Sequence, residues 1–125
     1  MKGMTNLALG TRGEELAADH LQAAGYRILE RNFRSKGGEV DIVAQDSGGT
    51  MVFVEVKTRS SLAFGLPQLA VTPRKQRQIA KGALSWLARH RRQQQAARFD
   101  VIAILLHDTG RFDLEHIINA FDLAY

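Results

Sequence analysis

The chain has 125 residues, of which 45% are hydrophobic and 24% are charged, and its formal net charge at pH 7 is +4. This is an ordinary composition for a soluble globular protein, and the length suits one domain, residues 1–125, with a substantial core. The absence of cysteine excludes a disulfide scaffold and a thiolate zinc site, and it fits a reducing cytoplasm. No stretch approaches the roughly 20 apolar residues of a membrane helix, so we expect a cytoplasmic protein without membrane contact.

Positive charge is concentrated in one part of the chain. From Val56 to Arg98 the sequence has no Asp or Glu but ten basic residues, whereas the remainder holds all thirteen acids and seven bases. The ten are Lys57, Arg59, Arg74, Lys75, Arg77, Lys81, Arg89, Arg91, Arg92 and Arg98. Such asymmetry is typical of a surface that binds a polyanion, and the alternative is a solvated basic helix without a partner.

Residues 10–24 are expected to form the first helix, because their apolar side chains fall within one arc of a helical wheel. Gly25 follows at the position where a left-handed residue commonly ends a helix. On this wheel Glu14 borders the buried arc, whereas Glu15 points away from it. We therefore expect Glu14 to reach toward the sheet, and we interpret His20, which falls inside the arc, as a core residue rather than a ligand.

Two segments with alternating apolar and polar residues predict a β-hairpin. A first strand is expected at residues 26–33, and the hairpin strands at residues 38–43 and 52–59 follow it. A turn-forming cluster at residues 46–50 separates the hairpin strands. If the turn is centred on Gly48, Gln45 lies opposite Met51, and the register of the two strands is fixed.

This register places Asp41 directly opposite Glu55. Opposed side chains in a sheet have Cβ atoms about 4.5–5.5 Å apart, and like charges at that distance destabilise the pairing. The pair therefore needs a counter-charge, which Lys57 on the same face supplies in part and a divalent cation would complete. Val43 and Phe53 share this face, which indicates a covered face with clustered carboxylates and hence a site. The alternative is the ordinary solvated face of a hairpin.

A connection and a second helix follow the hairpin. The connection at residues 60–67 has no periodicity and suits either a substrate-facing lid or a simple connector. The helix expected at residues 72–90 begins with a capping threonine and a proline. Arg74 and Lys75 in its first turn oppose the helix dipole, at a cost of about 0.3–1 kcal/mol each, which favours a docked phosphate at this end.

The last part of the chain is expected to form two strands. Residues 99–106 are nearly continuously apolar, as in a strand buried on both faces, and Asp100 within them is interpreted as a structural hydrogen-bonding or ion-pairing group. Residues 112–118 are a candidate edge strand. The order of helix, three strands, helix and strand, with one further strand, predicts an α/β sandwich with a mixed sheet and a helix on each side.

These residues resemble a known superfamily. Asp41 on one strand, Glu55-x-Lys57 on the next and a helical Glu14 ahead of them are similar to the site of the PD-(D/E)XK nucleases, with Val40 where the superfamily's name has proline. More closely, segments through most of the chain resemble the YraN-like family of bacterial proteins, which is described as similar to archaeal Holliday junction resolvases. The segments are Gly10-Thr11-Arg12-Gly13-Glu14, Gly38-Glu39-Val40-Asp41, Val52-Phe53-Val54-Glu55-Val56-Lys57-Thr58-Arg59, Phe64-Gly65 and Asn119-Ala120-Phe121. The resemblance implies a restriction-endonuclease-like αβββαβ core.

The resemblance also implies an endonuclease that hydrolyses phosphodiester bonds in DNA, including branched or junction DNA, with Mg²⁺ or Mn²⁺ as cofactor. Asp41 and Glu55 would hold the ion, and Glu14 would bind a second ion or its water. Lys57 would orient water and stabilise charge rather than act as a free base, because two carboxylates favour its charged form. Glu39, two residues before Asp41 on the same strand, is an additional candidate.

Contacts with DNA are expected from basic residues. Arg59, Arg74, Lys75 and Lys81 would bind backbone phosphates, which gives affinity without sequence readout. Resolvase-like enzymes act on two strands, which by analogy favours a homodimer. One alternative is a nucleic-acid-binding module with the same fold and no turnover, and another is a protein-interaction subunit with an acidic partner. Divalent-metal binding near Asp41 would distinguish the enzyme from the module.

Overall fold

A computed structural model describes residues 5–60 and 71–122 of the chain. Its elements are α1 (Asn6–Ala23), β1 (Arg27–Ser35), β2 (Gly38–Gln45), β3 (Met51–Arg59), α2 (Pro73–Arg89), β4 (Ala97–Leu106) and β5 (Phe112–Phe121). The expected order of elements is therefore confirmed, including the additional edge strand. The connection expected at residues 60–67 lies, from residue 61 onward, outside the described residues. Among the described residues no helix is long and apolar enough to cross a membrane.

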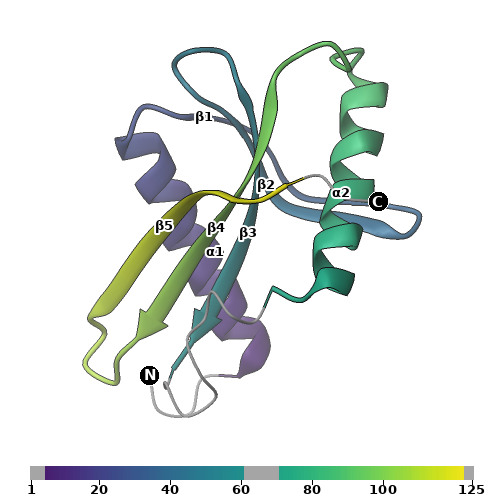
Figure 1. Cartoon of the computed structure of the whole chain (residues 1–125). Helices are drawn as coiled ribbons and strands as arrows, with labels where there is room; N and C mark the ends of the chain where they lie inside the picture. Colours follow the sequence, from purple (N-terminus) through teal and green to yellow (C-terminus); the bar gives the residue numbers. More distant parts are fainter. Residues whose placement is uncertain (1–4, 61–70, 123–125) are drawn as a thin grey trace.

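The five strands form one mixed sheet in the order β1-β2-β3-β4-β5. β3 and β4 are parallel, and the other neighbouring strands are antiparallel. Figure 1 shows α1 and α2 on opposite sides of this sheet. The predicted α/β class, a mixed central sheet flanked by helices in αβββαβ order, is confirmed.

The ends of both helices follow from local sequence. Thr5 caps α1, its Oγ1 accepting from the Ala8 N–H at 3.1 Å, and this cap lets the helix begin before residue 10, where the apolar arc placed its start. The helix ends at Ala23 with Ala24 as its cap, and Gly25, with a φ of 92°, turns the chain so that the Tyr26 N–H donates to the Leu21 carbonyl at 2.9 Å. Thr72 caps α2 in the same way as Thr5 caps α1.

Each helix covers its own hydrophobic cluster. On the α1 side, Leu21 packs with alternate residues of β2 and β3, among them Ile42 and Val54. On the α2 side, Trp86 and other helix residues pack with Val43 and Phe53. Burying a side chain of this size contributes about 1.5–3 kcal/mol. Because side chains alternate along a strand, Glu55 and Lys57 lie on the same face of β3 as Phe53, the face that α2 covers. On β2 the alternation is broken, because Val40 also packs in the α2 cluster whereas Ile42 packs in the α1 cluster.

A close backbone contact sets the distance between α2 and the sheet. A Cβ atom added at Gly38 would lie 2.4 Å from the Gly82 backbone nitrogen, and one added at Gly82 would lie 2.9 Å from the Glu39 nitrogen. Glycine at both positions therefore lets the helix rest directly on β2. This contact fixes the middle of α2 beside Glu39.

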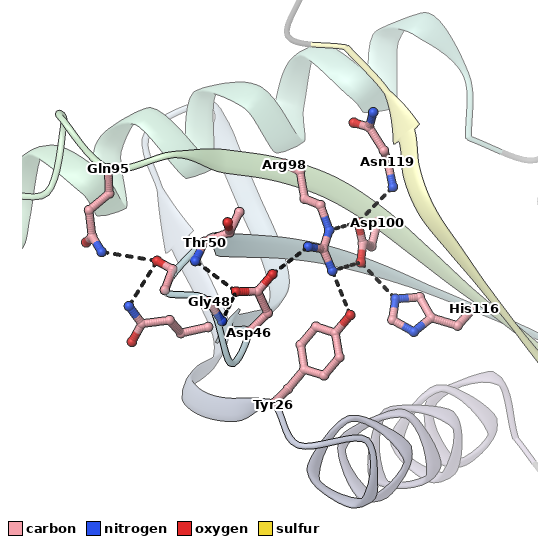
Figure 2. Close-up of polar contacts among 11 residues, drawn as sticks. Tyr26, Asp46, Gly48, Thr50, Gln95, Arg98, Asp100, His116 and Asn119 are labelled. Atoms are coloured by element: carbon pink, nitrogen blue, oxygen red, sulfur yellow. Dashed lines mark hydrogen bonds and ion pairs between the residues drawn. The ribbon is translucent and has the colours of Figure 1, made fainter.

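A buried polar network ties together the opposite end of the sheet (Figure 2). Asp100 is 0% exposed, and it accepts hydrogen bonds from the Arg98 guanidinium at 3.0 Å and from the Asn119 N–H at 3.0 Å. His116 Nε2 lies 2.8 Å from the other Asp100 oxygen, and Arg98 also binds Asp46 at 2.8 Å. The expectation of a structural, ion-paired Asp100 is confirmed.

The network also predicts that stability depends on pH. His20 Nε2 on α1 lies 3.2 Å from His116 Nδ1 on β5. Burial and the facing His116 lower the pKa of His20 below its ordinary value of 6.5. The unfolded chain therefore binds this proton more readily, so the stabilisation is complete above pH 6.5 and is lost as the pH falls through the lowered pKa.

We expect the unfolding free energy to drop between pH 7.5 and 5.5 by less than about 1 kcal/mol on account of His20, because this side chain is partly exposed and solvent screens its charge. Urea unfolding at both pH values measures the effect. The drop should be smaller in His20→Gln, whose side chain does not titrate. An equal drop in the two proteins would contradict the assignment.

Candidate functional site

The site is built on a fork in the sheet. Pairing between β2 and β3 follows the predicted register, with Gln45 opposite Met51, but it ends at Ile42 and Val54. β2 stays paired with β1 as far as Gly38, and β3 stays paired with β4 as far as Arg59. In Figure 1 the β1–β2 hairpin swings away from β3 beyond this point.

Asp41 fills the fork. Its Oδ2 accepts a hydrogen bond from the Val56 N–H at 2.8 Å, in place of the backbone partner that β2 would otherwise supply. Asp41 and Glu55 are therefore close, but they do not form the ladder pair that the register predicts. Since the N–H and C=O of a strand residue point to the same neighbouring strand, the Val56 carbonyl also faces the fork.

An open cavity of about 340 Å³ lies at this fork. Its lining includes Asn6, Leu7, Gly10, Thr11, Glu14, Asn32, Arg34, Glu39, Asp41, Glu55, Val56 and Lys75. The structure thus brings together four of the acids that sequence singled out, from α1, β2 and β3. A cavity with this lining concentrates negative charge in one place.

Burial raises the pKa of both central carboxyl groups. Glu55 is only 4% exposed, and burial followed by the nearby Asp41 raises its pKa to about 8. Burial also raises the pKa of Asp41, although its hydrogen bond with Val56 opposes the change. Two carboxylates in such contact do not both ionise readily, so the pair holds a proton at neutral pH.

Replacing Glu55 by glutamine is expected to stabilise the fold at alkaline pH. With a raised pKa, the contribution of Glu55 to stability is fully present below its ordinary value of 4.5 and is lost as the pH rises through about 8. Glutamine removes this loss, so Glu55→Gln should be more stable than wild type at pH 9 by roughly 1–4 kcal/mol. Urea unfolding at pH 6 and 9 measures the difference.

The exposed Glu15 supplies the matched control for that experiment. Glu15→Gln makes the same charge change on the surface of α1, and its stability should stay within about 0.5 kcal/mol of wild type at both pH values. If the unfolding free energies of Glu55→Gln and Glu15→Gln change equally between pH 6 and 9, the raised pKa of Glu55 is contradicted.

Glu14 approaches the pair from α1. Burial and, next, the Asp41 charge raise the pKa of Glu14, while a hydrogen bond with the Asn32 side chain lowers it. The approach depends on Gly13, where an added Cβ would lie 1.8 Å from Thr58 Oγ1. The glycine lets α1 touch β3 directly and so brings Glu14 to the fork.

Glu39 is held by two cations. Its carboxylate contacts Lys75 Nζ, and its other oxygen accepts from Arg34 Nη1 at 2.6 Å. The hydrogen bond from Lys75 contributes most to lowering the pKa of Glu39. Lys75 Nζ also lies 3.9 Å from Glu55 Oε1. The pKa of Glu39 is therefore lowered, whereas that of Glu55 is raised.

The other predicted residues lie around the cavity rather than in it. Lys57 is partly buried on β3 and lowers the pKa of Glu55 through its charge, but it is not among the residues that line the cavity. Arg59 lies at the end of β3, where its Nη1 donates to the Thr58 carbonyl at 3.2 Å. Arg74 and Lys81 are exposed on α2. Lys75 alone of the four expected phosphate contacts reaches the carboxylates.

Sequence reasoning missed Asn32 and Arg34. Asn32 has a φ of 54°, a conformation that asparagine tolerates, and it hydrogen-bonds with Glu14. Arg34 pairs directly across from Glu39 in the β1–β2 ladder. A sequence-based register for the β1–β2 hairpin, with its turn at Lys36 and Gly37, would have predicted that pairing.

The donor set is limited to oxygen ligands. In the described ranges, residues 5–60 and 71–122, no three Asp, Glu, His or Cys side chains are arranged to hold a metal ion. Asp41, Glu55 and the Val56 carbonyl are instead two carboxylates and one backbone oxygen at one fork. Mg²⁺ is usually held by one or two carboxylates, with waters and substrate phosphates completing its shell.

Two solved structures show a partial likeness to this chain. The structure of the EndoMS–dsDNA2 complex matches 70% of this chain and 34% of its own, at 20% identity and a TM-score of 0.41. The structure of Pyrococcus furiosus SfsA in complex with Ca²⁺ matches 89% of this chain and 63% of its own, at 16% identity and a TM-score of 0.41. The matched part of this chain thus spans about a third of the length of the first protein and under two thirds of the length of the second.

Sequence relatives match almost the whole length. A UPF0102 protein of Trichlorobacter lovleyi is 65% identical over 98% of this chain and 97% of its own, and one of Rhodococcus opacus is 48% identical over 93% and 98%. The model of the uncharacterised protein family UPF0102 matches residues 13–104. The resemblance to the YraN-like family is thereby confirmed, and the chain belongs to the UPF0102 family.

Proposed function

We propose that this protein is a metal-dependent nuclease that hydrolyses phosphodiester bonds in DNA. The observation that carries the proposal is the carboxyl pair of Asp41 and Glu55 at the fork of the sheet. Burying two acids together destabilises the fold, as the raised pKa of about 8 at Glu55 indicates, so the arrangement calls for a ligand that compensates it.

The residues at the fork fit Mg²⁺ or Mn²⁺. Asp41 and Glu55 would hold the ion, and the Val56 carbonyl is a further hard oxygen ligand on the same side of β3. When bound, such an ion polarises a phosphoryl oxygen and lowers the pKa of a coordinated water. Glu14, facing Asp41 from α1, is placed to bind a second ion or its water.

The chain's own residues would position the substrate. Hydrolysis adds one water across a P–O bond and leaves a phosphate monoester on one strand end and a hydroxyl on the other. Lys57, on the strand that carries Glu55, would orient water and stabilise the charge that develops on the phosphate. Arg59, Arg74 and Lys81 lie outside the cavity, where contacts with neighbouring backbone phosphates give affinity without sequence readout.

The finer substrate class follows from the family resemblance. Branched or junction DNA is proposed because the YraN-like motifs are similar to those of Holliday junction resolvases, which by the same analogy favours a homodimer. A cleavage assay tests this on labelled four-way junction, flap, duplex and single-stranded DNA, with Mg²⁺, Mn²⁺ or EDTA. We expect cutting that requires the metal and is fastest on a branched substrate. Binding to DNA without cutting under any metal condition would contradict the proposal.

A second candidate is a nucleic-acid-binding module with no turnover. The specific observation in its favour is Lys75, whose Nζ already supplies positive charge to Glu39 and Glu55 without a metal. In that case the acids would serve only to hold the lysine and the start of α2. Metal binding separates the two candidates, because the module has no use for a divalent ion at Asp41.

A further inference from the structure

Among the described basic residues of α2, the side chain of Lys75 is distinguished by its contacts with the carboxylates of the sheet. Its Nζ contacts Glu39 and lies 3.9 Å from Glu55 Oε1, and its side chain is 22% exposed. Arg74 and Arg77, one residue before and two after, are exposed. Lys75 therefore points into the carboxylate cavity, whereas its neighbours point to solvent.

The position of Lys75 is fixed from several directions. Its N–H donates to the capping Thr72 Oγ1 at 3.2 Å, so the residue belongs to the ordered first turn of α2. The contact between Gly38 and Gly82 holds the helix on β2 next to Glu39. Its Nζ lies between two carboxylates from different strands, Glu39 on β2 and Glu55 on β3. The ammonium group is therefore held among the acids.

Lys75, rather than Lys57, occupies the place of a counter-ion to the pair. Lys75 lines the cavity together with Asp41 and Glu55, and Lys57 does not. A cation of the protein and a divalent ion would neutralise the same charge on Glu55, so each lowers the affinity of the site for the other. Glu39 contacts the same Nζ, so the lysine keeps a carboxylate partner when Glu55 is engaged elsewhere.

We propose that Lys75 is the resident cation of this site, an inference that rests on the proposed nuclease function. Without a divalent ion it neutralises Glu39 and Glu55, and with substrate bound it donates to a non-bridging oxygen of the scissile phosphodiester. Glu39 is then a positioning residue that holds the ammonium group at the cavity rather than a metal ligand. The ligand class of Lys75 is thus the reacting phosphate, not the neighbouring backbone phosphates expected from sequence.

The test measures Mn²⁺ affinity in the absence of DNA, by calorimetry or by electron paramagnetic resonance of the free ion. Lys75→Met should bind Mn²⁺ about tenfold more tightly than wild type, because a competing charge a few ångströms away is removed. Arg77→Met, which removes an exposed charge from the opposite side of the same helix, should bind within about twofold of wild type. Urea unfolding of both variants establishes that they are folded, and Lys75→Gln serves as a second variant.

Cleavage kinetics supply the second readout. Lys75→Met should lower kcat by roughly a hundredfold with little change in KM, as expected when a donor to the reacting phosphate is lost. A loss confined to KM would show an ordinary backbone contact and overturn the inference. Unchanged or weaker Mn²⁺ binding by Lys75→Met and Lys75→Gln, with wild type binding normally, would also overturn it. Absence of Mn²⁺ binding by every protein would instead refute the metal site itself, and this inference with it.

Discussion

Replacing Asp41 by asparagine is expected to lower DNA cleavage by on the order of a thousandfold, because the lost carboxylate removes several kcal/mol of charge stabilisation at the reacting phosphate. The variant should remain folded. Asparagine keeps an oxygen that accepts the Val56 N–H, which Asp41 binds at 2.8 Å in the wild type. Cleavage rates under single-turnover conditions with Mn²⁺ measure the effect.

Alanine is the wrong substitution for this experiment, because it would leave the Val56 N–H without its partner at a cost of about 1–3 kcal/mol. The matched control is Glu15→Gln, which neutralises an exposed acid of α1 next to Glu14. Its cleavage rate should stay within about threefold of wild type. Wild-type cleavage in Asp41→Asn would remove the metal-site mechanism altogether.

Replacing Gly13 by alanine is expected to destabilise the protein by about 3 kcal/mol and to reduce activity as well. The added Cβ would lie 1.8 Å from Thr58 Oγ1 and 2.9 Å from Thr58 Cβ, so α1 has to move away from β3. Overpacking of this kind costs roughly 1–3 kcal/mol, and occasionally more. Because Glu14 follows directly in the sequence, the same shift carries it away from Asp41. Urea unfolding gives the stability change.

Gly10 is the control in the same helix. A Cβ added there would have no atom within 4 Å, and alanine in a helix interior is favoured over glycine by roughly 0.5–1 kcal/mol. Gly10→Ala should therefore raise the unfolding free energy while Gly13→Ala lowers it. Opposite signs at two glycines of one helix are a sharp expectation, and equal effects would disprove the close contact of α1 with β3.

The sequence was sufficient to predict the elements and much of the sheet. Period-2 alternation and a glycine-centred turn predicted the pairing of Gln45 with Met51, and the structure has that register. The capping signals of α2 at Thr72 were also predictive, because they depend on local chemistry. The start of α1 was less accurate, since an apolar arc marks where a helix is buried rather than where it begins.

The details of the site required the structure. Alternation along two strands does not reveal where their pairing stops, so the fork at Asp41 and its bond to Val56 were not predictable. A helical wheel places Lys75 in the first turn of α2, but it cannot tell whether the long side chain turns to solvent or to Glu39. The close glycine contact at Gly38 likewise depends on how the helix packs on the sheet.

The fork explains why the acids gather where they do. The pairing of β2 with β3 stops at Ile42 and Val54. Beyond it, the Asp41 side chain rather than a backbone carbonyl accepts the hydrogen bond of the Val56 N–H on β3. The opening admits Glu14 from one face of the sheet and Lys75 from the other, so elements on opposite sides meet at one cavity. A continuous ladder would have kept these two side chains apart.

Titration of the wild-type protein with Mn²⁺, with the free ion followed by electron paramagnetic resonance, tests whether the fork of the sheet is a metal site. The titration should be run above pH 8. The pKa of Glu55 is raised to about 8, and the carboxyl group has to lose its proton before it can bind a metal. We expect at least one bound ion per chain, with binding lost in Asp41→Asn. A free-ion signal that rises in proportion to total Mn²⁺ throughout the titration would show that the fork binds no metal.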